Sequence, residues 1–68
     1  MNTFTAILHR EGDIYVAECP EVGSVSQGLT IDEAVANLKE ATELYLEESE
    51  FTPAHRTIIT TFEAGVHA

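Results

Sequence analysis

Histidine and cysteine are the side chains of this sequence best suited to nucleophilic or metal chemistry, and they are few and scattered. His9, His55 and His67 show no spacing, to one another or to the single cysteine, that is typical of a metal site. Cys19 closes an apolar run, and a cysteine in such a position usually packs as a small hydrophobic side chain. These residues therefore indicate neither a catalytic thiol nor a histidine-ligated metal.

Four carboxylates in the first third of the sequence are a second candidate, because oxygen ligands suit hard divalent cations. Acidic side chains near a hairpin are usually solvated, however, and the sequence has no glycine-rich loop that would bind a phosphate. We therefore expect no catalytic residue, no cofactor and no metal ligand, and we rank a metal-dependent enzyme third among three hypotheses. The carboxylates are Glu11, Asp13, Glu18 and Glu21.

The chain is strongly acidic. Twelve acidic residues stand against three Lys and Arg residues, which gives a formal net charge of −9. Affinity for nucleic acids depends largely on basic side chains at the phosphates, so we expect no direct binding to DNA or RNA. The charge favours a basic protein partner through electrostatic steering, although acidity also keeps small domains soluble.

The length of 68 residues allows a single domain over residues 1–68, with a small core that self-association would help to stabilise. One cysteine excludes an internal disulfide and fits a reducing compartment. No apolar run approaches the roughly 20 residues that cross a bilayer, and the first residues lack a signal-peptide pattern. We therefore expect a cytoplasmic protein that does not bind membranes and forms a homo-oligomer.

Periodicity and turn residues predict four strands and one helix. The strands are expected at residues 3–10, 13–19, 24–27 and 56–62, which are rich in β-branched and apolar side chains. The breaks between them fall at glycine and proline, and Gly12 should take a positive φ in a tight turn. The predicted order is βββαβ, an α+β fold with a mainly antiparallel sheet and one helix packed on one face.

The helix is expected to begin at a capping box. The Thr30 side chain can accept a hydrogen bond from the backbone three residues on, and the Glu33 side chain can reach back. Apolar residues then recur as one helical stripe until the acidic cluster near Glu48. Leu44 falls off this stripe among glutamates, and we predict that it contacts another chain. The stripe comprises Ile31, Ala34, Val35, Leu38, Ala41, Thr42 and Tyr45.

The first turn decides which side chains share a face of the sheet. If residues 11 and 12 form a two-residue loop, Arg10 lies opposite Asp13 and Leu8 opposite Tyr15, on an almost wholly apolar face that the helix should cover. A three-residue turn would exchange the two faces. We expect the uncovered face and the acidic side of the helix to bind another chain. The candidate partner-binding residues are Ile7, His9, Ile14, Val16 and Glu18 on the sheet, and Glu40, Glu43, Leu44 and Glu47 on the helix.

Several short motifs share their order and spacing with one protein family. They are Cys19-Pro20-Glu21, Gly23, Gln27-Gly28, Asp32-Glu33-Ala34 and Asn37-Leu38-Lys39-Glu40-Ala41. Through these motifs, about residues 3–48 resemble the HicB family of antitoxins. The resemblance implies a partial RNase H-like βββαβ fold. It also implies binding to a small, basic, mRNA-cleaving toxin of the HicA family, whose active site the antitoxin covers.

Two functional hypotheses therefore lead, and neither is enzymatic. The first is a HicB-like antitoxin that occludes a HicA-type toxin. The second is a solitary homo-oligomeric HicB-like domain, most simply a dimer, with a structural or regulatory role. Many HicB proteins carry a C-terminal DNA-binding segment, whereas the residues that follow this helix are assigned to the fourth strand, so we do not expect direct binding to an operator.

Overall fold

The computed structural model describes residues 2–48 and 57–66 of the chain. Three strands form one antiparallel sheet in the order β1-β2-β3. Strand β1 spans Ile7–Glu11, β2 spans Ile14–Cys19 and β3 spans Ser24–Gly28. The second and third strands agree with the sequence prediction within a residue, whereas the first begins four residues later than expected.

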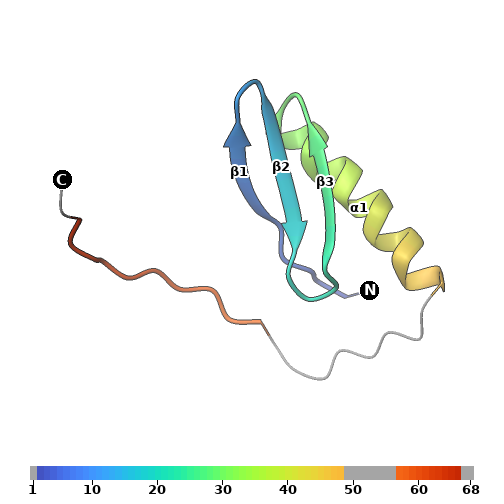
Figure 1. The fold of residues 1–68 in the computed structure, drawn as a ribbon. Helices are drawn as coiled ribbons and strands as arrows, with labels where there is room; N and C mark the ends of the chain where they lie inside the picture. The colour runs from blue at the N-terminus through green and yellow to red at the C-terminus, as the bar shows by residue number, and fades with distance from the viewer. Residues whose placement is uncertain (1, 49–56, 67–68) are drawn as a thin grey trace.

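One helix, α1 at Ile31–Glu48, lies against one face of the sheet (Figure 1). It begins as predicted, because the Thr30 hydroxyl accepts the Glu33 N–H at 3.0 Å. The Glu33 carboxylate in turn accepts the Leu29 N–H at 3.2 Å, which completes the reciprocal cap. The expected α+β fold, with an antiparallel sheet and one helix on one face, is confirmed. Within the two described stretches, no helix has the length and apolar character that a bilayer crossing demands.

The β1–β2 hairpin turns one residue later than predicted, at Gly12 and Asp13. Gly12 has a φ of 61°, in the left-handed region that favours glycine. Arg10 therefore pairs with Tyr15 instead of Asp13, and its guanidinium carbon lies 5.9 Å from the centre of the Tyr15 ring. A turn displaced by one residue moves the register by two, so every side chain keeps its predicted face.

The helix contacts the sheet through a narrower stripe than the sequence predicts. Ala34, Leu38 and Thr42 are buried, a line of residues four apart. Three other members of the predicted stripe are exposed instead: Val35 beside this line, and Ile31 and Tyr45 beyond its two ends.

A close approach at Gly28 explains the narrow contact. A Cβ atom at Gly28 would lie 2.6 Å from the backbone nitrogen of Ala34, so only glycine lets the helix come this near to β3. The buried side chains of β2 in the core beneath the helix, Ala17 and Cys19, are both small. Because α1 packs mainly on β3 and β2, its side toward β1, which includes Val35, has no strand beneath it.

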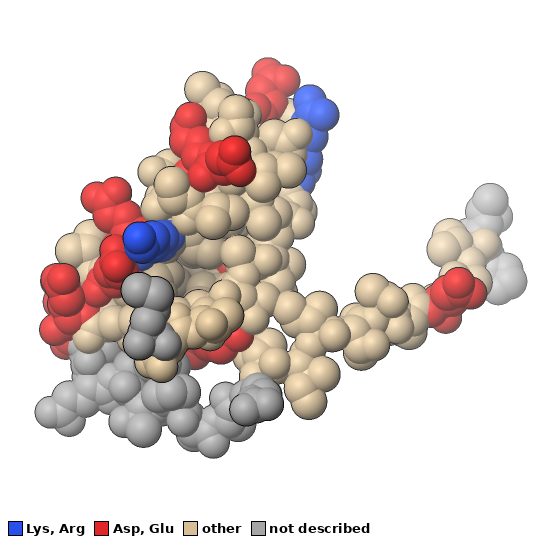
Figure 2. All heavy atoms as spheres, turned by 180° about the vertical axis from the view of Figure 1, so that it is seen from behind, with Lys and Arg blue, Asp and Glu red and all other residues tan. Residues whose placement is uncertain are grey.

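The predicted fourth strand is not formed in the described residues. Residues 57–66 have neither helix nor strand, and they project from the body of the domain as an arm (Figures 1 and 2). A strand needs a partner backbone alongside it, and this arm runs away from both edges of the sheet. Arg56, the first residue of the predicted strand, lies outside the described residues.

Candidate protein-binding surfaces

The face of the sheet turned away from α1 carries all five sheet residues predicted to bind a partner. The strand register places them there, because side chains alternate between the two faces of a strand. Ile7 is 40% exposed, and Ile14 and Val16 are half-buried. His9 and Glu18 are exposed. We call this surface the open sheet face, and it comprises Ile7, His9, Ile14, Val16, Glu18, Val25 and Gln27.

The last two members of the open sheet face were missed in the sequence analysis. Val25 pairs with Glu18, and Gln27 pairs with Val16, so β3 extends the face by one strand. Val25 is exposed in spite of its apolar side chain. The alternation of residues 24–28, combined with antiparallel pairing to β2, is the signal that would have found them.

The four helix residues predicted to bind a partner lie together on the surface of α1. Glu40, Glu43, Leu44 and Glu47 follow the i, i+3, i+4, i+7 spacing of one helical face, and all are exposed. Leu44 is 54% exposed, so its predicted place off the core stripe is confirmed. Acidic side chains gather over this side of the molecule in Figure 2. We call these four residues the acidic helix face.

The open sheet face and the acidic helix face lie on opposite sides of the molecule. The helix covers the sheet through Ala34, Leu38 and Thr42. At 100° per residue, the acidic helix face projects from the far side of the helix, about 180° away from that line. The structure therefore separates the nine predicted residues into two surfaces, and each would serve a different contact.

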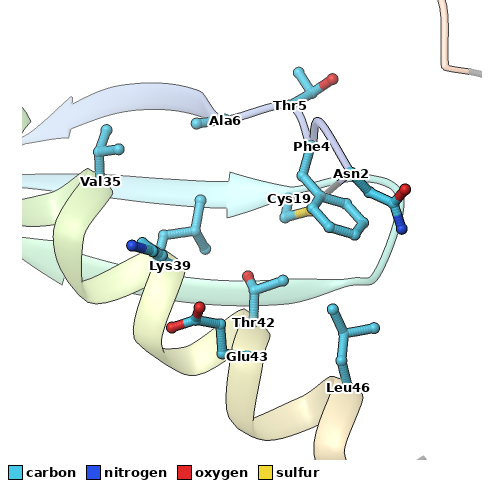
Figure 3. A pocket seen from close by; sticks show the side chains of 11 residues that line it. Asn2, Phe4, Thr5, Ala6, Cys19, Val35, Lys39, Thr42, Glu43 and Leu46 are labelled. Carbon is cyan, nitrogen blue, oxygen red and sulfur yellow. The ribbon is translucent and has the colours of Figure 1, made fainter.

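A groove of about 490 Å³ opens between the N-terminal segment and α1, along the helix from Val35 to Leu46. Phe4 and Leu46 point toward one another from its two walls, and Cys19 lies on β2 next to the Phe4 ring (Figure 3). Two charged side chains, Lys39 and Glu43, also line it and are exposed. The groove was not predicted, because it arises from the helix lying over β2 and β3, a tertiary arrangement that local sequence patterns do not report.

Glu21 joins the N-terminal segment to the turn after β2. Its carboxylate accepts the Thr5 N–H at 3.0 Å and the Thr5 hydroxyl at 2.6 Å, one on each oxygen. The Cys19 thiol also donates to Glu21 Oε1 at 3.4 Å. We call these contacts the carboxylate clamp. They give the motif Cys19-Pro20-Glu21 a structural role, since they hold one wall of the groove in place.

The clamp shifts the pKa values of its two acidic groups in opposite directions. The hydrogen bond from the Thr5 hydroxyl lowers the pKa of Glu21 to about 2, because it favours the ionised carboxylate. Burial raises the pKa of the Cys19 thiol, since it disfavours the charged form. Cys19 is 1% exposed and stays protonated at neutral pH, so the prediction that it packs as a small hydrophobic side chain is confirmed.

The candidate metal ligands of the hairpin do not come together. Across the part of the chain that the structure describes, no three Asp, Glu, His or Cys side chains are close enough to hold a metal ion. His9 Nε2 lies 3.7 Å from Glu11 Oε1, and both side chains are exposed. His55 and His67 lie outside the described residues.

The described residues form a small α+β domain with two exposed faces and a groove. No family model matches the sequence. The sequence is 45% identical over 49 residues to the UPF0150 protein ssr1258 of Synechocystis sp., and the match covers 69% of this chain and 71% of that relative. The chain therefore belongs to the UPF0150 family. No solved structure matches it.

Proposed function

We propose that this chain is a HicB-like antitoxin module that binds and occludes a small, basic, mRNA-cleaving toxin of the HicA type. The motifs between Cys19 and Ala41 that resemble HicB antitoxins support the proposal, and membership of the UPF0150 family is compatible with it. The observation that carries it is the acidic helix face, in which three carboxylates surround the exposed side chain of Leu44. An apolar centre within a charged rim is the usual anatomy of a protein interface.

In this proposal the antitoxin acts by competing with RNA for the toxin's basic surface. Glu40, Glu43 and Glu47 present negative charges along one side of α1, as phosphates do along a nucleic-acid strand. Charges of this kind steer a basic partner and raise the association rate more than the final affinity. Leu44 would supply apolar burial at the centre of the contact. The module would act in the cytoplasm, where the toxin meets mRNA.

The first test measures association rates with a short basic toxin of the HicA type, which is to be sought in the flanking reading frames. The rate constant should fall about tenfold or more between 10 mM and 150 mM salt, because the Debye length shrinks from about 30 Å to about 8 Å. An association rate that does not change with salt would show that the acidic helix face does not steer the toxin. Its charges would then serve only to keep the domain soluble.

Paired substitutions separate the acidic helix face from the net charge of the chain. The double change Glu43→Gln with Glu47→Gln should lower the association rate at low salt by about tenfold, as added salt does. The control, Glu11→Gln with Asp13→Asn, removes two charges at the hairpin turn, on a different part of the surface. It should have a much smaller effect. Equal effects of the two pairs would contradict a contact through the helix.

A homo-oligomer formed through the open sheet face is the second candidate function. Ile7 and Val25 are exposed on this face, next to the half-buried Ile14 and Val16, and β1 and β3 are edge strands. A two-fold contact would bury these side chains against their copies. Light scattering tests it: Val25→Lys should dissociate such an oligomer, and a mass that does not respond to this change would exclude the face as the contact.

A further inference from the structure

The C-terminal arm, residues 57–66, has the sequence pattern of a strand with one buried face. In an extended chain alternate residues share a face, and this places Ile58, Phe62, Ala64 and Val66 together, interrupted by Thr60. Ile58 is 82% exposed, Phe62 90% and Val66 92%, the largest values among the exposed large hydrophobic side chains of the described residues. An apolar strand face this exposed calls for a covering surface, and no described residue covers it in this arrangement.

The chain as a whole exposes more surface than a compact monomer of its size. Its accessible surface is 5851 Å², against about 4,200 Å² expected for a folded monomer of 7.4 kDa. Its Cα radius of gyration is 14.1 Å, against about 11 Å for a compact domain of 68 residues. The excess is roughly 1,600 Å² per copy, so two copies that covered it would bury an area typical of a permanent dimer, about 2,000–5,000 Å².

The groove matches the arm in length and chemistry. Extended residues rise about 3.3 Å each, so Ile58 and Phe62 would be about 13 Å apart. The groove runs along α1 from Val35 to Leu46, which a helix separates by about 16 Å. Mainly apolar side chains line the groove, which suits the apolar face of the arm.

The groove also adjoins a free strand edge. Thr5 and Ala6 line the groove and lead directly into β1. Strand β1 lies at the edge of the sheet, with β2 on one side and no strand of the described residues on the other. A strand that entered the groove could therefore place side chains between the N-terminal segment and α1 while its backbone paired along this edge, which is the usual mode of strand addition.

We propose that the arm of one copy docks in the groove of a second copy, and that the second arm docks reciprocally, to form a strand-exchanged homodimer. A second copy is favoured because the arm runs away from the end of the sheet where its own groove opens (Figure 1). In a two-fold exchange each arm occupies the groove of the other copy, so neither an arm nor a groove remains uncovered. The proposed dimer contact and the proposed toxin contact share only Glu43, which lines the groove, since Glu40, Leu44 and Glu47 do not line it.

Light scattering and sedimentation on the full chain test the exchange. The wild-type mass should be that of a dimer, and Phe62→Asp should raise the dimer dissociation constant at least about 100-fold, because each dimer loses two buried aromatic anchors. Thr61→Asp is the matched control on the other face of the arm, and it should change the constant only slightly. On the groove side, Leu46→Lys should act like Phe62→Asp, and Ala36→Lys, on exposed helix surface, should not.

Mixing the two defective variants distinguishes exchange from every other arrangement. Phe62→Asp retains an intact groove and Leu46→Lys retains an intact arm, so the mixture should form a heterodimer at concentrations where each variant alone is monomeric. If Leu46→Lys unfolds the domain, Val35→Lys, at a 38% exposed position of the same groove, replaces it. Amide hydrogen exchange should show protection of residues 57–66 in the dimer.

Four outcomes would overturn the proposal. A monomeric wild type with a protected arm would place the arm in the groove of its own chain. A monomeric wild type with an unprotected arm would show that the arm does not bind a second copy, and a different partner would then have to cover it. A dimer that is indifferent to Phe62→Asp, or variants that fail to complement one another, would move the contact to another surface, such as the open sheet face.

Discussion

Glu21→Gln should destabilise the domain at neutral pH and remove one part of its sensitivity to acid. Each oxygen of the Glu21 carboxylate accepts a hydrogen bond from Thr5, one from the N–H and one from the hydroxyl. Glutamine has the same length but is neutral and has only one acceptor oxygen. The substitution therefore weakens the carboxylate clamp without changing the shape of the side chain.

The pKa of Glu21 sets the size of the effect. It is lowered from 4.5 to about 2 in the folded chain, and at about 1.4 kcal/mol per unit this corresponds to an upper bound of roughly 3 kcal/mol. Glu21 is partly exposed, so screening by water reduces the expected contribution to about 1–2 kcal/mol. Because the folded pKa is the lower one, this stabilisation is complete above about pH 4.5 and is lost as the pH falls to about 2.

Thermal unfolding followed by circular dichroism, at pH 7 and at steps from pH 5 to pH 2, measures both effects. At pH 7, Glu21→Gln should lower the Tm by about 5–15 °C, because 1 kcal/mol shifts a domain of this size by about 4–8 °C. Glu40→Gln, the same change on the exposed helix surface, should lower it by less than about 3 °C. The wild type and Glu21→Gln should converge near pH 2. A constant difference between them from pH 5 to pH 2 would refute the reasoning.

Three further predictions follow from the packing and the charge. Leu44→Asp should weaken toxin binding at least about 30-fold in calorimetry and leave the Tm nearly unchanged, whereas Leu29→Asp, a matched exposed leucine, should alter neither. Gly28→Ala should cost about 1–3 kcal/mol in urea unfolding, because its Cβ would meet the helix backbone at 2.6 Å, whereas Gly65→Ala should be neutral. Duplex DNA should show no binding in fluorescence anisotropy at moderate salt, since the sequence has three Lys and Arg residues.

The parts of the fold that follow local rules could be predicted from the sequence. Thr30 and Glu33 form a cap because both partners lie within one helical turn, and the positive φ at Gly12 follows from the needs of a tight turn. The two faces of the sheet were also predictable, because side-chain alternation tolerates a turn displaced by one residue. Only the register changed, and with it the neighbour of Arg10.

The parts that depend on tertiary placement could not be predicted. Periodicity alone does not predict that the helix packs close to β3 at Gly28. This packing buries Ala34, and Val35 lies beside an open groove. The clamp at Glu21 joins residues sixteen positions apart, so no local pattern revealed it. Residues 57–62 have a strand pattern that remains informative, although no strand of the described residues pairs with it. The pattern indicates that one face of this segment is buried, and we propose that the groove of a second copy buries it.

An RNA-cleavage titration tests the central claim most directly. A HicA-type toxin would be held at a fixed concentration well above the dissociation constant, and its cleavage of a labelled mRNA would be measured as this chain is added. We predict that activity falls linearly and reaches zero at a fixed stoichiometric ratio, and that Leu44→Asp shifts the curve to higher concentration while Leu29→Asp leaves it in place. Undiminished cleavage at a large excess of the folded chain would contradict the proposed antitoxin function.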